Sequence, residues 1–262
     1  MPEEIKKVLV VALEGAAGGE VHGKVQAGKL PNLQRLMAEG ATLLGVVADP
    51  SPSISWATLA TGAHAVTHGV TGDETCRAQY IWQAAAKASK KAALLGYPAS
   101  ALPESSDELP ADLLKPTVRD RPYYDRVAAY LRSSPDWDLA FIGLSADPGS
   151  LQEADDALGT VIEAADPETL RVCAVVPGGG GDALAVLAGP GVLRGKTVRR
   201  LVELVDLAPT ICHLAELPIP ADCEGGIVYQ ALVDPDAKMV ELQACRRNYE
   251  RLRRSTGRGP MC

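Results

Sequence analysis

The stretch that decides the fold lies near the N-terminus, where residues 8–13 read Val-Leu-Val-Val-Ala-Leu. A continuous apolar run of this length is typical of a β-strand that is buried on both faces, as in a parallel sheet covered by helices. Similar runs recur along the chain and alternate with segments whose apolar residues follow helical spacing. This alternation predicts a three-layer αβα sandwich around a mostly parallel central sheet.

The two patterns place the expected elements along the chain. Strands are expected at residues 8–13, 42–48, 92–96, 139–144, 170–176 and 183–188. A helical segment is expected between Gly19 and Gly40, and further helices around residues 56–61, 80–89, 124–131, 150–165 and 201–214. The stretch from residue 98 to residue 122 is rich in proline, serine and aspartate, which predicts an irregular excursion. Together these elements predict one α/β domain over residues 1–236.

Composition narrows the classes of function and location. The chain has 26 Lys and Arg against 33 Asp and Glu, and its formal net charge is −7. This balance argues against nucleic-acid binding, which needs a basic surface. No apolar run reaches the roughly 18 residues that a membrane span needs. The charged N-terminus leads straight into a strand without a secretory apolar segment, so we expect a cytoplasmic protein without a membrane span.

The last part of the chain, residues 237–262, has a different composition. Apolar residues recur there at spacings of three, three, four and three, at Met239, Leu242, Cys245, Tyr249 and Leu252. Arginines occupy other positions of the same segment, at 246, 247, 251 and 254. This pattern predicts a basic amphipathic helix and tail. Its apolar face either packs on the chain's own domain or docks on a second copy or an unknown protein partner.

Four pairs of short motifs occur in a fixed order over about residues 7–232. They are residues 8–14 with LPNL at 30–33, SISWATLATG at 53–62 with THGV at 67–70, YIW at 80–82 with LGYP at 95–98, and VDLAPTI at 205–211 with LPIP at 217–220. In order and spacing they resemble the type I phosphodiesterase/nucleotide pyrophosphatase branch of the alkaline-phosphatase superfamily. The resemblance implies an alkaline-phosphatase-like fold.

The resemblance also implies a particular chemistry. Members of this family use two metal ions, usually zinc, held by aspartate and histidine, and a serine or threonine nucleophile at a helix N-terminus. The metals lower the pKa of the nucleophile and clamp the attacking and leaving oxygens. The helix N-terminus donates backbone N–H groups to the phosphoryl oxygens.

Most of the implied metal ligands are replaced in this chain. Glu14 stands where the family has its first aspartate, and Asp147 keeps the aspartate of an Asp-x-x-x-His pair whose histidine is Leu151. The family's Asp-His-Gly corresponds to Pro177-Gly178-Gly179, and Asp182 is the nearest polar residue to the position of the last histidine. Glu14, Asp147 and Asp182 are therefore the candidate remnants of a metal site, and we expect no zinc pair because carboxylates alone hold soft metals poorly.

None of the four histidines replaces one of the missing metal ligands. His68 occupies a position that is structural in the family, and His213 lies in an apolar helical pattern that predicts packing. His22 falls on the first expected helix, and His64 lies in a segment that carries no ligand in the family. The sequence thus supplies no histidine at an expected ligand position.

The implied nucleophile falls within the stretch of residues 51–55. Counting back from Thr61-Gly62 places Pro52 at the family's nucleophile position, so Ser53 is the candidate after a register shift and Ser51 is the alternative. Ser55 and Trp56 are candidate binding residues at the same helix start. The competing interpretation is structural, because serines at such positions commonly cap the helix that follows.

Three hypotheses follow for the function. The first is a non-catalytic family member that acts as a binding or scaffold subunit and needs no cofactor. The second is a divergent phosphoester hydrolase that uses Ser53 with Glu14, Asp147 and Asp182 around one Mg²⁺ or Mn²⁺ ion. The third is a module that holds a phosphorylated small molecule at the start of the helix at Ser53–Trp56 without cleaving it.

Overall fold

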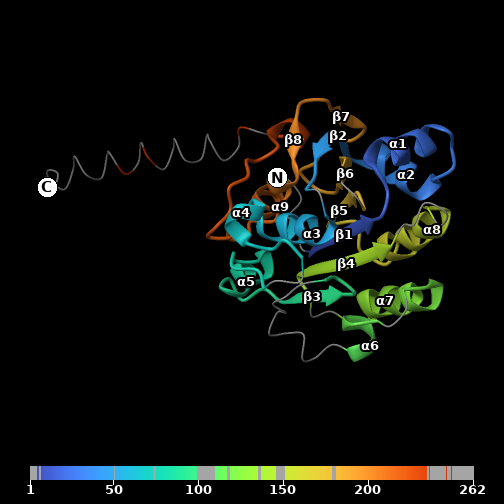
Figure 1. Ribbon diagram of the computed structural model, residues 1–262, viewed down its shortest axis with the longest axis horizontal. Coiled ribbons are helices and arrows are strands. Elements are labelled where there is room, and N and C mark those ends of the chain that lie inside the picture. Colours follow the sequence, from blue (N-terminus) through green and yellow to red (C-terminus); the bar gives the residue numbers. More distant parts are fainter. Residues whose placement is uncertain are drawn as a thin grey trace, which may run out of the picture.

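A mostly parallel sheet forms the centre of the computed structural model (Figure 1). The structure describes residues 5, 7–49, 51–72, 75–98, 110–116, 119–134, 137–145, 151–178, 181–234, 236, 246 and 249. The strands of this described part are β1 (Lys7–Glu14), β2 (Ala41–Val47), β3 (Ala92–Leu95), β4 (Leu139–Ser145), β5 (Thr169–Val176), β6 (Asp182–Ala188), β7 (Lys196–Val198) and β8 (Val202–Glu203). Their order is β3-β4-β1-β5-β6-β2-β7, and β8 also pairs with β2. β6 runs antiparallel to β5 and β2, whereas the other pairs are parallel.

Strand β1 shows why the sheet is covered on both sides. Its residues from Val8 to Leu13 are all buried, and successive side chains of a strand point to opposite faces. Leu9 and Leu13 belong to one apolar cluster, whereas Val8 and Val10 belong to another. The first cluster lies under α1 (Gly18–Gln26), α2 (Pro31–Glu39), α6 (Ala111–Leu114), α7 (Arg121–Ser133) and α8 (Leu151–Ile162). The second lies under α3 (Pro52–Thr61), α5 (Ile81–Ala86) and α9 (Leu207–Leu214).

These two clusters confirm the predicted three-layer αβα sandwich. Figure 1 shows the helices of the two outer layers on either side of the sheet. The short helix α4 (Ala65–His68) follows α3, and single turns of 3-10 helix occur at η2 (Leu204–Asp206) and η3 (Tyr229–Ala231). None of the described helices is long and apolar enough to cross a membrane.

Helix α2 is held at both ends by neighbouring elements. The backbone N–H groups of Asn32 and Leu33 in its first turn donate to the Asp155 carboxylate of α8, at 2.9 and 2.8 Å. The side-chain amide of Asn32 donates to the same carboxylate at 3.1 Å. Asp155 is buried, and burial raises the pKa of its carboxyl group. At the other end, Gly40 passes so close to Leu187 and Ala188 of β6 that no room remains for a β-carbon.

Three predicted helices begin three or more residues away from the expected position, and α7 is one of them, at Arg121 rather than at residue 124. α3 starts at Pro52 rather than at residue 56, because Ser51 caps it and proline suits the first helical position. The predicted helix over residues 201–214 begins only at Leu207, since β8 and η2 come first. The Glu203 backbone N–H donates to the Asp206 carboxylate at 3.1 Å, and this local bond defines the turn between strand and helix.

The remaining predictions fall partly on residues outside the described ones. Within the predicted excursion at 98–122, residues 111–114 form α6 and α7 begins at Arg121, whereas residues 99–109 and 117–118 are not described. Of the predicted C-terminal helix, the structure describes Arg246 and Tyr249, which are helical and exposed. The boundary at residue 236 therefore stays a prediction.

Candidate functional site

The carboxyl ends of the parallel strands meet at one edge of the sheet. Glu14, the last residue of β1, lies in register with Ser145 at the end of β4 and with Val176 at the end of β5. Asp182 begins the antiparallel β6 and therefore lies at the same edge, opposite Val47 of β2. Ligands of open α/β sheets bind at this edge, so it is the candidate site. Asp147 follows β4 in the sequence but lies outside the described residues.

The Glu14 carboxylate is held by an aromatic side chain. The indole Nε1 of Trp56 in α3 donates to Glu14 Oε2 at 3.0 Å. Trp56 is itself fixed, because the buried Tyr97 hydroxyl donates to its backbone oxygen at 2.7 Å and the two rings pack edge to face at 4.6 Å. The Glu14 carboxylate is thus oriented toward the Trp56 indole N–H, within a packed aromatic cluster.

The second candidate carboxylate points elsewhere. Asp182 is exposed, and its Oδ2 would lie 3.1 Å from a β-carbon added to Gly19 near the start of α1. This places the carboxylate beside a helix N-terminus, where negative charge is favourable. The structure therefore brings Glu14 and Asp182 to one edge but gives them different neighbours, Trp56 and α1.

The three serines of the α3 start occupy three different environments. Ser51 is the N-cap, and its Oγ accepts from the Ile54 backbone N–H at 3.4 Å. Ser53 lies in the first turn of the helix and is exposed. Ser55 is buried, with its Oγ 3.5 Å from the backbone oxygen of Asp49 as acceptor. The capping interpretation is thus correct for Ser51 and wrong for Ser53 and Ser55, which lie inside the helix because it starts at Pro52.

A buried hydrogen-bonded chain below this helix start was not predicted. The Val70 backbone N–H donates to His68 Nδ1 at 3.1 Å, so the proton of the neutral ring lies on Nε2. His68 Nε2 lies 3.1 Å from Thr58 Oγ1, which in turn donates to Asp49 Oδ2 at 2.6 Å. The chain ties α3 to the loop before it and to α4. In the sequence, Thr58 and His68 lie in the quoted motifs, whereas nothing marks Asp49.

We expect His68 to make the protein less stable as the pH falls below about 6.5. Burial lowers the folded-state pKa of His68 below its ordinary value of 6.5, although Asp49 opposes this shift. Since the unfolded chain binds the proton more readily, the stability that His68 contributes is complete above pH 6.5. It is lost as the pH falls toward the folded-state pKa, by at most about 1.4 kcal/mol per pH unit.

Urea unfolding between pH 7.5 and 5.5 measures this dependence. The slope should be shallower in His68→Gln than in the wild type. Equal slopes in the wild type and His68→Gln would contradict the prediction.

The described residues do not fit a pair of zinc ions. Leu151, at the position of an implied histidine, is buried in the core, and Pro177 and Gly178 carry no ligand atoms in their side chains. His64 Nε2 lies 3.7 Å from Glu203, and His213 packs edge to face on Tyr229. Within the described part of the chain, no three His, Cys, Asp or Glu side chains come together as a metal site would need.

A cavity of about 560 Å³ opens beside the candidate site. Its lining comes from the starts of α7 and α8 and from Ser145, the strand neighbour of Glu14. Arg119 and Arg121 line it together with the carboxylates of Asp120, Glu153 and Asp156, so the lining has no net positive charge. Tyr124 closes the wall, with its hydroxyl 3.4 Å from the Gly143 backbone oxygen. Burial raises the pKa of Tyr124, which therefore stays neutral at physiological pH. The volume suits a small molecule.

Comparison with solved structures identifies proteins with the same fold. A putative sulfatase from Bacteroides thetaiotaomicron matches with a TM-score of 0.68 and 14% identity over 86% of this chain and 74% of its own. Murine ectonucleotide pyrophosphatase/phosphodiesterase 5 matches with a TM-score of 0.64 and 12% identity over 81% and 96%. A phosphonate monoester hydrolase from Silicibacter pomeroyi matches with a TM-score of 0.62 and 14% identity over 85% and 76%.

The likeness is one of structure. No protein-family model matches the chain, and a search of curated proteins finds no match. One matching structure is a threonine-to-alanine variant of the murine phosphodiesterase, described as inactive, in complex with AMP. At 12 to 14% identity these proteins establish the fold of the chain and leave its activity to be argued from its own residues.

Proposed function

We propose that this chain, which has the alkaline-phosphatase-like fold, is a non-catalytic member of that group and acts as a binding or scaffold subunit. The fold itself is established, because the sulfatases, the phosphonate monoester hydrolase and the phosphodiesterase that match it all belong to the alkaline-phosphatase superfamily. The resemblance inferred from the sequence motifs is therefore confirmed at the level of fold.

The observation that carries the proposal is the replacement of the implied metal ligands by side chains that cannot bind a metal, because Leu151 is buried in the core and Pro177 and Gly178 carry no ligand atom. At Glu14, the Trp56 indole donates to Oε2 at 3.0 Å, which leaves Oε1 as the carboxylate oxygen without that bond. We infer that the chain binds no zinc pair and needs no cofactor. A partner or a second copy would bind through residues 237–262.

A second candidate function is hydrolysis of a phosphoester. The exposed Ser53 lies in the first turn of α3, close to where backbone N–H groups of a helix start stabilise a phosphoryl group. Glu14, with Asp147 and Asp182, would then hold one Mg²⁺ or Mn²⁺ ion. The structurally similar proteins are named as a phosphonate monoester hydrolase, a phosphodiesterase and a sulfatase, which supports this candidate. A serine without such activation is a poor nucleophile.

A third candidate is binding of a phosphorylated small molecule without cleavage. The size of the cavity beside Ser145 supports it, whereas the three carboxylates that line this cavity with Arg119 and Arg121 disfavour an anion. Ser55 and Trp56 would support the helix start from inside, because both side chains are buried.

Metal content and turnover decide between the first two candidates. The full chain, purified without chelator, is expected to carry substoichiometric zinc. With added Mg²⁺, Mn²⁺ or Zn²⁺ it should hydrolyse nitrophenyl phosphate, its diester and nitrophenyl sulfate no faster than the double variant Ser51→Ala/Ser53→Ala, which lacks both candidate nucleophiles.

The matched control is Ser51→Ala, which removes the neighbouring hydroxyl. Turnover with Mn²⁺ that Ser53→Ala lowers by orders of magnitude and Ser51→Ala preserves would replace the proposal with the hydrolase. About two zinc ions per chain would likewise overturn it.

A further inference from the structure

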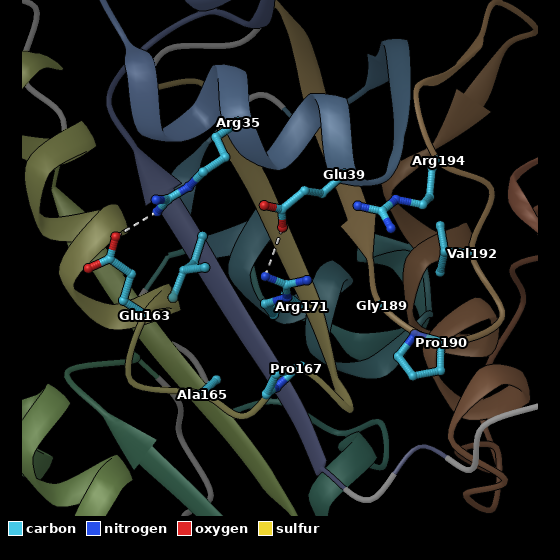
Figure 2. Close-up of a pocket in the computed structure, with 11 residues that line it drawn as sticks. Arg35, Glu39, Glu163, Ala165, Pro167, Arg171, Gly189, Pro190, Val192 and Arg194 are labelled. Atoms are coloured by element: carbon cyan, nitrogen blue, oxygen red, sulfur yellow. Dashed lines mark hydrogen bonds and ion pairs between the residues drawn. The ribbon is translucent and has the colours of Figure 1, made fainter.

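A second cavity lies at the opposite edge of the sheet from the candidate site. Figure 2 shows this pocket, which has a volume of about 600 Å³. It is bounded by the end of α2, the end of α8, the beginning of β5 and the loop after β6. Because Arg171 is the third residue of β5 and Gly189 follows β6, the pocket faces away from the edge that carries Glu14.

Three arginines and two glutamates line this pocket. Arg35 pairs with Glu163 at 2.9 Å, and Arg171 pairs with Glu39 at 3.0 Å (Figure 2). Arg194 comes from the loop after β6, and Figure 2 shows its guanidinium directed toward the middle of the pocket. After the two pairs are formed, one positive charge remains in a chain whose formal net charge is −7.

Arg171 has a donor that the protein does not use. Its side chain is only 18% exposed, and its Nη1 donates to Glu39. Its Nε is buried and has no hydrogen-bond partner in the described part of the chain. A buried charged donor without a partner costs about 1–3 kcal/mol or more, so native proteins seldom leave one unpaired.

The free donor lies on the edge of the guanidinium that recognises oxyanions. The Nε–H and one N–H of the far amino group are parallel and match the two oxygens of a carboxylate or phosphate. The lining of the pocket also includes the apolar side chains of Ile162, Pro167 and Val192.

We propose that this pocket binds a small amphipathic anion near Arg194, and that the Arg171 guanidinium turns so that its Nε edge, which protein atoms cover in this structure, meets the carboxylate or phosphate group. The apolar body of the ligand lies against Ile162, Pro167 and Val192. The volume is in the range of small-molecule sites. The site is independent of the proposed function, because it uses other residues at the other edge of the sheet.

Calorimetric titration of the full chain with two probes tests this site. Phenyl phosphate represents the phosphate source and benzoate the carboxylate source, and phenol is the uncharged control. We expect saturable binding of at least one anionic probe and none of phenol, and the tighter probe identifies the head group. The NMR signal of the Arg171 Nε–H should shift on binding.

Two variants locate the binding. Arg171→Lys keeps the charge beside Glu39 but removes the Nε edge, and Arg194→Ala removes an exposed side chain. Each is expected to weaken the Kd about tenfold, the usual effect of one charge-assisted hydrogen bond. Arg35→Ala, in an exposed pair, and Ser53→Ala, at the other edge, should change the Kd less than threefold.

Two results would overturn the proposal. One is the absence of saturable binding by either anion at concentrations up to about 10 mM, because a Kd above that value is weaker than small-molecule sites usually have. The other is binding that both Arg171→Lys and Arg194→Ala leave unchanged, because the probe would then occupy a different place. Since Arg194→Ala removes no buried contact, its result stands even if Arg171→Lys fails to fold.

Discussion

We expect the Asp155→Ala variant to lose about 3 kcal/mol of unfolding free energy relative to the wild type. The variant removes the acceptor for three donors of α2, two of which are backbone N–H groups of its first turn. Asn32 and Leu33 would be left without a partner where water has little access, because Asp155 and Leu33 are both buried. Burial also disfavours the charged form of the Asp155 carboxyl group. The expected loss of unfolding free energy is therefore smaller than the sum of three charge-assisted hydrogen bonds.

Urea unfolding at neutral pH measures the difference. Asp156→Ala is the matched control, because Asp156 is the next residue of α8 and is exposed. It should change the free energy of unfolding by less than about 0.5 kcal/mol. Asp155→Asn should fall between the two, since its amide oxygen can still accept from one N–H group. Similar stabilities for the two alanine variants would show that α2 does not depend on this carboxylate.

The second large effect is expected for Gly40→Ala, with a loss of about 3 kcal/mol or more. A β-carbon at Gly40 would overlap the backbone oxygen of Leu187 and press on Ala188. These atoms belong to β6, which is paired on both sides within the sheet. The end of α2 and the start of β2 would have to move away from the sheet to make room.

Gly23→Ala is the matched control for that variant. Gly23 lies in α1, and apart from its chain neighbours and the backbone of its own helix no atom lies within 4 Å of a β-carbon added there. Alanine favours the helix by roughly 0.5–1 kcal/mol over glycine, so Gly23→Ala should be as stable as the wild type or more so. Thermal unfolding of both variants checks the pair. A Gly40→Ala protein that unfolds at the wild-type temperature would contradict the packing described here.

The sequence predicts the three layers of the fold well, because a strand that is buried on both faces needs an unbroken run of apolar residues. The unbroken apolar run of β1 follows from its cover on both faces, and its neighbours in the sheet show the same property. The start of α3 was missed because Pro52 looks like a breaker until Ser51 is recognised as the cap. The short β7 contains Lys196 and Thr197 and carries no apolar run to detect.

The sites were harder to predict because they depend on contacts between distant segments. The motifs contain both Glu14 and Trp56, but their hydrogen bond joins residues 42 positions apart. Asp155 falls within an amphipathic helix, where a charged residue ordinarily faces water. Arg171 stands in an otherwise apolar strand, and this interruption was the one sequence signal for the second pocket.

Strand β5 runs from one of these regions to the other, and its length has a consequence for experiments with ligands. Arg171 and Val176 are five residues apart along it, or about 17 Å. A molecule that fills a 600 Å³ pocket is roughly 10 Å across and cannot touch both ends. Two ligands can therefore occupy the chain simultaneously without colliding. Any mutual exclusion in a titration would report a change in protein conformation rather than competition for space.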